Sequence, residues 1–114
     1  MLPDDFVDSL PVESFMRALP TRLDPEKARD TDLCAVFHFT DVNEEYTVHV
    51  RKGVAELRKR AVIGPDLDIN TTAKTWKRIV LKKTSPVVAF ASGNIGLHGG
   101  VTDIVRFLGL FNRD

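Results

Sequence analysis

The spacing of hydrophobic residues changes twice along the chain, and each change predicts a different kind of element. The first apolar stripe recurs at i, i+3, i+4 and i+7, the pattern of an amphipathic helix packed on a core. Its members are Val12, Phe15, Met16 and Leu19. Pro11 stands where such a helix begins, and Pro20, which has no amide hydrogen, is expected to end or kink it.

From residue 32 the apolar positions alternate with polar ones, which is typical of strands with one buried face. The alternating apolar positions are Leu33, Ala35, Phe37, Phe39, Tyr46, Val48 and Val50. A polar turn over 41–44 and the turn Lys52-Gly53 separate three segments, the last over 54–60. Short links between successive strands predict an antiparallel meander, and a fourth short strand is expected over 67–70.

The helical spacing returns after Thr71 or Thr72, either of which can cap a helix. Its predicted inner face holds Ala73, Trp76, Ile79, Val80 and Lys83. Ser85-Pro86 is a hydroxyl cap followed by proline at the first helical position, so a short helix over 86–92 is predicted, ending at Gly93. Ile95 and Leu97 predict a last strand, and a last helix begins near Thr102. The chain is therefore expected to be α+β, in the order α-β-β-β-β-α-α-β-α.

A length of 114 residues fits one domain, predicted over 11–114, with residues 1–10 as a poorly ordered lead-in. The acidic start has no basic segment leading into an apolar run, and no apolar run is long enough to span a membrane. We therefore expect no signal peptide, no transmembrane segment and a cytoplasmic location. The single cysteine, Cys34, allows no intrachain disulfide and no four-thiolate zinc site.

Candidate chemistry is sparse. The histidines His38, His49 and His98 form no closely spaced pair, so no metal site is predicted, and nothing near Cys34 would lower its thiol pKa and make it a nucleophile. No serine lies in a Gly-x-Ser-x-Gly elbow, and the glycines over 92–100 are better explained by turns and caps than by phosphate binding. No catalytic residue and no cofactor are predicted, and the chain is not expected to be an enzyme.

Charge is balanced overall but uneven along the chain. Residues 51–83 hold ten Lys or Arg and three acids. This segment contains a single aromatic residue, Trp76, on the apolar side of its helix. Stacking platforms for nucleic acid need aromatic side chains exposed among the basic residues, so no nucleic-acid partner is predicted. Two interpretations remain for this local excess of positive charge. It is either an ordinary solvated surface, or a basic rim for an anionic headgroup with Lys74, Lys77 or Arg78 as candidates.

Several segments resemble the sterol carrier protein (type two) fold family, and most closely its branch at the C-terminus of alkyl sulfatases. They are Thr40–Val48, Val50–Val54, Asp66–Thr72 and Ser85–Gly93, followed by Ile95, Leu97, Gly99 and Leu108–Phe111. The resemblance covers about residues 12–112, and Gly99-Gly100-Val101 departs from it where the family usually has an acidic residue after glycine.

The resemblance implies a curved, mostly antiparallel five-stranded sheet with helices packed on one face, and an apolar cavity between the layers. It implies a noncatalytic domain for an apolar or amphiphilic ligand (a fatty acyl, sterol or alkyl chain), recruiting hydrophobic substrate for a separate partner hydrolase. The candidate ligand-binding residues are Phe37, Phe39, Tyr46, Val48, Trp76, Ile79, Val80, Phe90, Leu108 and Phe111. The alternative is a module with a filled core that mediates protein interaction or homodimerisation without a ligand.

Overall fold

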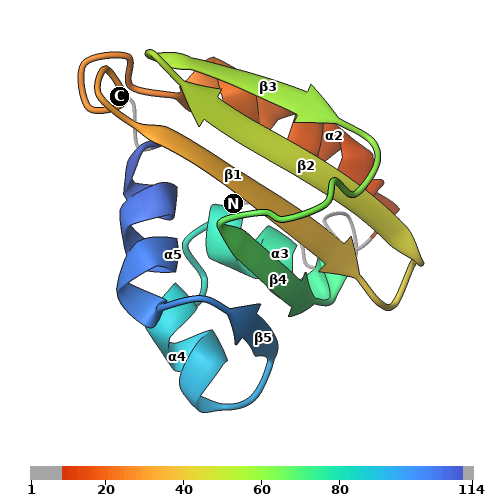
Figure 1. Cartoon of the computed structure of the whole chain (residues 1–114). Coiled ribbons are helices and arrows are strands. Elements are labelled where there is room, and N and C mark those ends of the chain that lie inside the picture. The colour runs from red at the N-terminus through yellow and green to blue at the C-terminus, as the bar shows by residue number, and fades with distance from the viewer. Residues whose placement is uncertain (1–8, 112–114) are drawn as a thin grey trace.

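The computed structural model describes residues 9–111, so most of the predicted lead-in over 1–10 lies outside the described residues. Within this range the predicted order of helices and strands is confirmed (Figure 1). The helices are α2 Val12–Ala18, the 3-10 helix η1 Leu19–Arg22, α3 Ala73–Val80, α4 Pro86–Ala91 and α5 Val101–Gly109. The strands are β1 Asp32–Phe39, β2 Glu44–Arg51, β3 Val54–Arg58, β4 Leu67–Thr71 and β5 Ile95–His98.

The five strands form one mixed sheet in the order β3-β2-β1-β4-β5. The predicted meander is confirmed, because β1 pairs with β2 and β2 with β3 in antiparallel fashion. The chain then returns past β1, and β4 joins its free edge in parallel, with Phe37 opposite Ile69. Strand β5 closes the sheet antiparallel to β4, so the sheet is mostly antiparallel with one parallel pair.

The helices cover one face of the sheet, with α3 directly behind the strands and α4 and α5 beyond the β4–β5 end (Figure 1). An aromatic cluster joins the two layers. The ring centroid of Phe37 lies 4.8 Å from that of Trp76 on α3 and 6.0 Å from that of Phe107 on α5. On the same face, Phe39 lies 5.8 Å from Tyr46. These side chains are fully buried, so the strand alternation places its large apolar members between the layers.

Local signals predicted where the helices begin. The Thr72 hydroxyl accepts a hydrogen bond from the amide of Thr75 at 3.1 Å, and the Ser85 hydroxyl accepts one from the amide of Val88 at 3.0 Å. Both are the expected N-caps. Helix α5 instead begins after Gly100, which offers no side-chain cap, at the point where the sequence departs from the family pattern.

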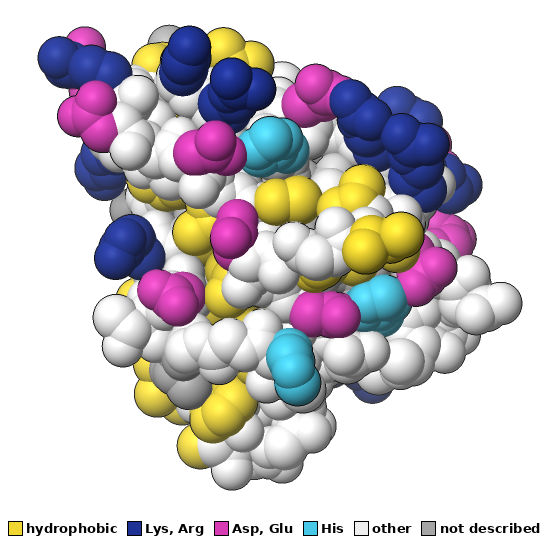
Figure 2. Space-filling view, viewed as in Figure 1, with side chains coloured by type: hydrophobic (Ala, Val, Ile, Leu, Met, Phe, Trp, Pro, Cys, Tyr) yellow, Lys and Arg dark blue, Asp and Glu magenta, His cyan; other side chains and the backbone are white. Residues whose placement is uncertain are grey.

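The opposite face of the sheet is of mixed character. Figure 2 shows histidine and acidic side chains spread over it, with hydrophobic side chains between them. His38 lies between two carboxylates, with Nδ1 2.5 Å from Glu45 and Nε2 2.7 Å from Asp68. His49 pairs with Asp32 at 2.7 Å. Exposed pairs of this kind contribute little to stability, and the apolar face of the sheet accounts for the fold.

Candidate ligand-binding site

A pocket of about 810 Å³ lies within the helical layer, between η1, α3, α4 and α5. Its volume falls within the range of about 300–1,000 Å³ typical of small-molecule sites. Sixteen residues line it, most of them apolar: Leu19, Arg22, Trp76, Ile79, Val80, Lys82, Lys83, Thr84, Ser85, Pro86, Val87, Val88, Val105, Leu108, Gly109 and Phe111. The pocket therefore offers an apolar ligand a lining built from four separate helical segments.

The inner wall of the pocket belongs to the buried core, whereas its outer wall reaches the surface. Trp76 and Phe111 are buried, at 1% and 5% exposed. On α4, Val87 and Val88 are 53% and 59% exposed although they line the same pocket. Because helix α4 has only six residues and is apolar throughout, it exposes apolar side chains that the sheet does not cover. Exposed valines beside a pocket are typical of a binding surface.

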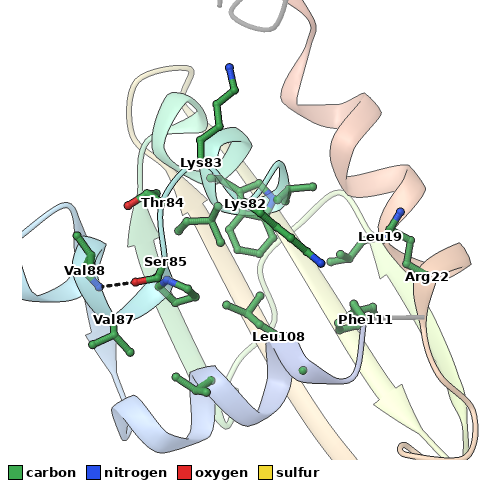
Figure 3. Close-up of a pocket in the computed structure, with 16 residues that line it drawn as sticks. Leu19, Arg22, Lys82, Lys83, Thr84, Ser85, Val87, Val88, Leu108 and Phe111 are labelled. Atoms are coloured by element: carbon green, nitrogen blue, oxygen red, sulfur yellow. Dashed lines mark hydrogen bonds between the residues drawn. The ribbon is translucent and has the colours of Figure 1, made fainter. Parts of the chain in front are cut away.

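Polar lining residues gather on the segment between α3 and α4 and on η1 (Figure 3). Arg22, Lys82 and Lys83 are exposed cations, and Thr84 and Ser85 add hydroxyl groups. The Ser85 hydroxyl already accepts from the Val88 amide, so its lone pairs are partly used in capping α4. The described lining residues thus include three cations and no acid.

The structure divides the ten predicted ligand-binding residues into two groups. Five line the pocket: Trp76, Ile79, Val80, Leu108 and Phe111. Four others, Phe37, Phe39, Tyr46 and Val48, are fully buried in the interface between the sheet and the helices and do not line it. Phe90 is 39% exposed and also lies outside the lining. The pocket thus lies among the helices, not between the sheet and the helical layer.

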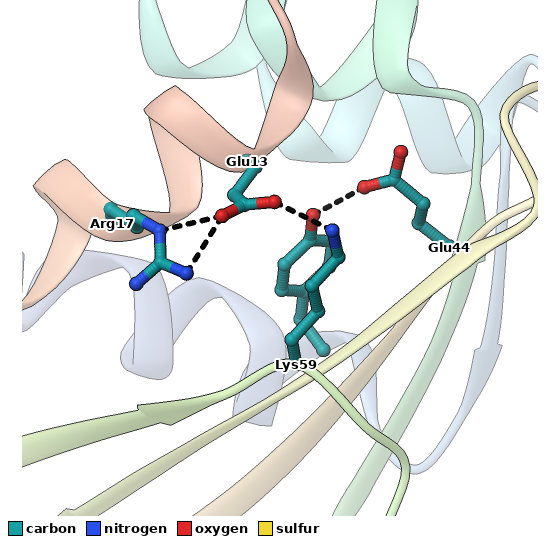
Figure 4. Close-up of polar contacts among 5 residues, drawn as sticks. Glu13, Arg17, Glu44 and Lys59 are labelled. Atoms are coloured by element: carbon teal, nitrogen blue, oxygen red, sulfur yellow. Dashed lines mark hydrogen bonds and ion pairs between the residues drawn. The ribbon is translucent and has the colours of Figure 1, made fainter.

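The hydroxyl of Tyr46 donates a hydrogen bond to Glu44 (Figure 4). Burial, followed by the neighbouring Glu44 carboxylate, raises the pKa of Tyr46. Nearby, Glu13 on α2 accepts from Lys59 at 2.6 Å and from Arg17 at 2.7 Å. Hydrogen bonds from Lys59 and then Arg17 hold the Glu13 pKa below its ordinary value. The Lys59–Glu13 pair links α2 to the residue that follows β3, whereas the Arg17–Glu13 pair lies within α2.

The basic residues that the sequence suggested for a headgroup are not those at the pocket. Lys74, Lys77 and Arg78 do not line it, and Lys77 is only 5% exposed. The Lys77 ammonium donates to the Leu10 carbonyl and lies 5.9 Å from the centre of the Phe15 ring. The cations that do line the pocket, Lys82 and Lys83, follow α3 directly, and only the turn after that helix brings them to the rim.

Across residues 9–111, no group of three or more His, Cys, Asp or Glu side chains is arranged to hold a metal ion. In the same range, no helix has the length and apolar character needed to cross a membrane. Cys34 is partly buried on β1, and desolvation, followed by the charges of Asp66 and Asp32, raises its thiol pKa. A thiol with a raised pKa is less available as a nucleophile.

Comparison with solved structures places the fold in two groups. An inverting sec-alkylsulfatase from Pseudomonas sp. superposes with a TM-score of 0.85 at 25% identity, over 94% of this chain and 17% of that chain. Sterol carrier protein 2 from Yarrowia lipolytica, in its apo form, superposes with a TM-score of 0.66 at 17% identity, over 96% of this chain and 93% of that chain. Palmitated SCP2L2 from Aedes aegypti superposes with a TM-score of 0.68 at 16% identity, over 90% of this chain and 92% of that chain. The last two show the same fold in separate small proteins.

Sequence comparison agrees with the first group. The chain is 31% identical over 111 residues to a linear primary-alkylsulfatase of Pseudomonas sp. (strain ATCC 19151). The aligned residues make up 97% of this chain and 21% of the relative. The chain thus spans about a fifth of the length of that curated relative. The family model of the alkyl sulfatase C-terminal domain matches residues 2–114. With this match over almost its whole length, the chain belongs to the alkyl sulfatase C-terminal family and has the fold of sterol carrier proteins.

Proposed function

We propose that this domain is a noncatalytic binding domain that holds an apolar or amphiphilic ligand, such as a fatty acyl, sterol or alkyl chain, in the pocket between η1, α3, α4 and α5. One observation carries the proposal: the pocket of about 810 Å³ whose apolar inner wall continues into exposed valines on α4. The contact residues proposed for the chain are Trp76, Ile79, Val80, Leu108 and Phe111.

The size of the hydrophobic effect makes such a pocket useful. Burying one methylene group contributes about 0.8 kcal/mol, so a dodecyl chain offers roughly 8–10 kcal/mol in total. Loss of translational and rotational freedom costs about 4–15 kcal/mol, so only the surplus appears as affinity. At the low end of this cost a surplus of about 4–6 kcal/mol remains for a dodecyl chain, which corresponds to a dissociation constant of roughly 40 μM to 1 mM, and a shorter chain binds more weakly.

The relatives support a role within a larger hydrolase. Two of them are alkylsulfatases, of which this chain corresponds to about a fifth, 21% and 17% of their lengths. We propose that the domain recruits a hydrophobic substrate, an alkyl sulfate or a chemically similar amphiphile, for a separate catalytic module. The palmitated sterol carrier relative supports the idea that this fold can hold an acyl chain.

The alternative function is a protein-interaction or dimerisation module. One observation favours it: Val87, Val88 and Phe90 expose apolar surface on α4, at 53%, 59% and 39%. A second chain seated there would cover the same valines that line the pocket. A dimer that persists on dilution in sedimentation experiments, together with no ligand uptake, would support this alternative.

Native mass spectrometry of the domain, first as purified and then with dodecyl sulfate or palmitate, tests the proposal. We expect one ligand per protomer at saturation, with the longer chain retained more strongly. The ions should carry a single mass increment that disappears when a competing amphiphile is added. A protein that keeps its unliganded mass with both amphiphiles would contradict the ligand-binding function.

A further inference from the structure

We propose that Lys82, together with Arg22, binds the anionic head of a single-chain amphiphile whose chain lies in the pocket, so that the domain selects anionic over neutral ligands of the same length. This inference rests on the proposed ligand-binding function and adds the residues that recognise the head of the ligand. The shared chemistry is an anionic head on an alkyl chain, either a sulfate or a carboxylate.

The charge of the lining is the first argument. Arg22, Lys82 and Lys83 contribute positive charge to the pocket, and the described lining residues include no Asp or Glu. In the same wall, the buried indole N–H of Trp76 has no hydrogen-bond acceptor among the described residues. The polar groups that distinguish this pocket are therefore mainly donors and cations, which favour a ligand that brings acceptor oxygens and negative charge.

The direction of the side chains distinguishes the cations. In Figure 3 the Lys82 side chain extends across the pocket toward Leu19 and Arg22, whereas Lys83 points away from it. Lys82 follows the C-terminal end of α3 and Arg22 lies on η1, so the two cations come from separate segments that both line the pocket. A headgroup seated between them would leave its chain free to follow the apolar wall inward.

The backbone at Lys82 supplies an argument that is independent of charge. Helix α3 ends in a Schellman motif, in which the Lys82 amide donates to the Ile79 carbonyl at 3.0 Å and the Lys83 amide donates to the Arg78 carbonyl at 2.8 Å. Lys82 occupies the left-handed position of this motif, with φ of 61°. Glycine is the usual residue there, because a Cβ atom is disfavoured at positive φ. Lys82 therefore holds a backbone conformation that is strained for a residue with a Cβ atom, as Lys52 and Asn43 also do, and strained positions of this kind are found more often at functional sites.

The test compares three ligands with a common twelve-carbon chain, dodecyl sulfate, dodecanoate and dodecanol, below their micelle concentrations. The substitution Lys82→Gly removes the cation and relieves the backbone, so the free energy of unfolding should stay equal or rise. We expect dodecyl sulfate binding to weaken about tenfold, the effect of one charge-assisted hydrogen bond at an exposed site. Dodecanol binding should be unchanged.

The matched control is Lys83→Ala, which removes the same charge from the lining on a side chain that points away, and should change anion affinity less than twofold. Lys82→Asn is a second variant, since asparagine also tolerates positive φ. Equal losses with sulfate and carboxylate would support a general anionic head, and a larger loss with sulfate would support an alkyl sulfate.

Two outcomes overturn the inference while leaving ligand binding intact: dodecanol binding as tightly as dodecyl sulfate, or Lys82→Gly and Lys83→Ala weakening the anion equally. If none of the three ligands binds the wild-type domain, both this inference and the proposed function fail.

Discussion

The substitution Gly109→Leu tests the location of the ligand without disturbing the fold. Gly109 is the last residue of α5 and lines the pocket. A Cβ atom placed there would have no heavy atom within 4 Å other than its own chain neighbours and helix backbone, so a larger side chain has open space to enter. The residue is not among the glycines with positive φ, so the backbone accepts leucine without strain.

The expected effects on binding and on stability have opposite signs. A leucine side chain that occupies part of the pocket displaces about three ligand methylenes, each worth about 0.8 kcal/mol, a loss of about 2–3 kcal/mol. This corresponds to roughly 30- to 150-fold weaker binding. Replacing glycine in a helix gains up to about 1 kcal/mol, with a smaller gain at the helix end. The variant should therefore unfold no more easily than the wild type.

Isothermal titration with dodecyl sulfate measures the affinity, and urea denaturation measures the free energy of unfolding. Gly109→Ala is the control, because it removes the glycine but leaves the pocket open, so its affinity should stay close to that of the wild type. A folded Gly109→Leu protein that binds dodecyl sulfate with unchanged affinity would refute the assignment of the ligand to this pocket.

Three further predictions concern the core, acid stability and the thiol. Phe37→Ala leaves a cavity at a fully buried site beside Trp76 and should lower the free energy of unfolding, measured by urea denaturation, by about 3–5 kcal/mol. The protein that remains folded should still bind the ligand. Loss of binding at unchanged stability would instead place Phe37 at the ligand. The Glu13 pKa is held below its ordinary value of 4.5 mainly by Lys59, so its stabilising effect is present above that value and is lost as the pH falls through the lowered pKa. Glu13→Gln should therefore flatten the acid side of the stability–pH curve, and an unchanged curve would contradict this. Because its pKa is raised, Cys34 should react with iodoacetamide at pH 8 more slowly than free cysteine, and faster reaction would count against the burial argument.

Local sequence signals determined most of the secondary structure. The alternation of Phe37 and Phe39 with polar neighbours indicates a strand with one buried face, because successive side chains point to opposite sides. Thr72 and Ser85 could be predicted as N-caps because each capping hydrogen bond joins residues only three positions apart, so it depends on the local sequence alone. The family resemblance also followed from the sequence, since it depends on the order of turns and apolar positions, and the family match over residues 2–114 confirms it.

Only the tertiary structure decided where the pocket lies. Phe37 and Leu108 are both apolar residues in regular patterns, yet Phe37 is fully buried beneath α3 and Leu108 lines the pocket. The difference depends on how far the helices stand apart once the strands have paired, and no local pattern carries that distance. Lys82 is the same case: the sequence predicts it to be a charged residue within a helix that reaches Lys83, whereas α3 ends at Val80. The turn that gives it a positive φ directs its side chain across a space that other segments enclose.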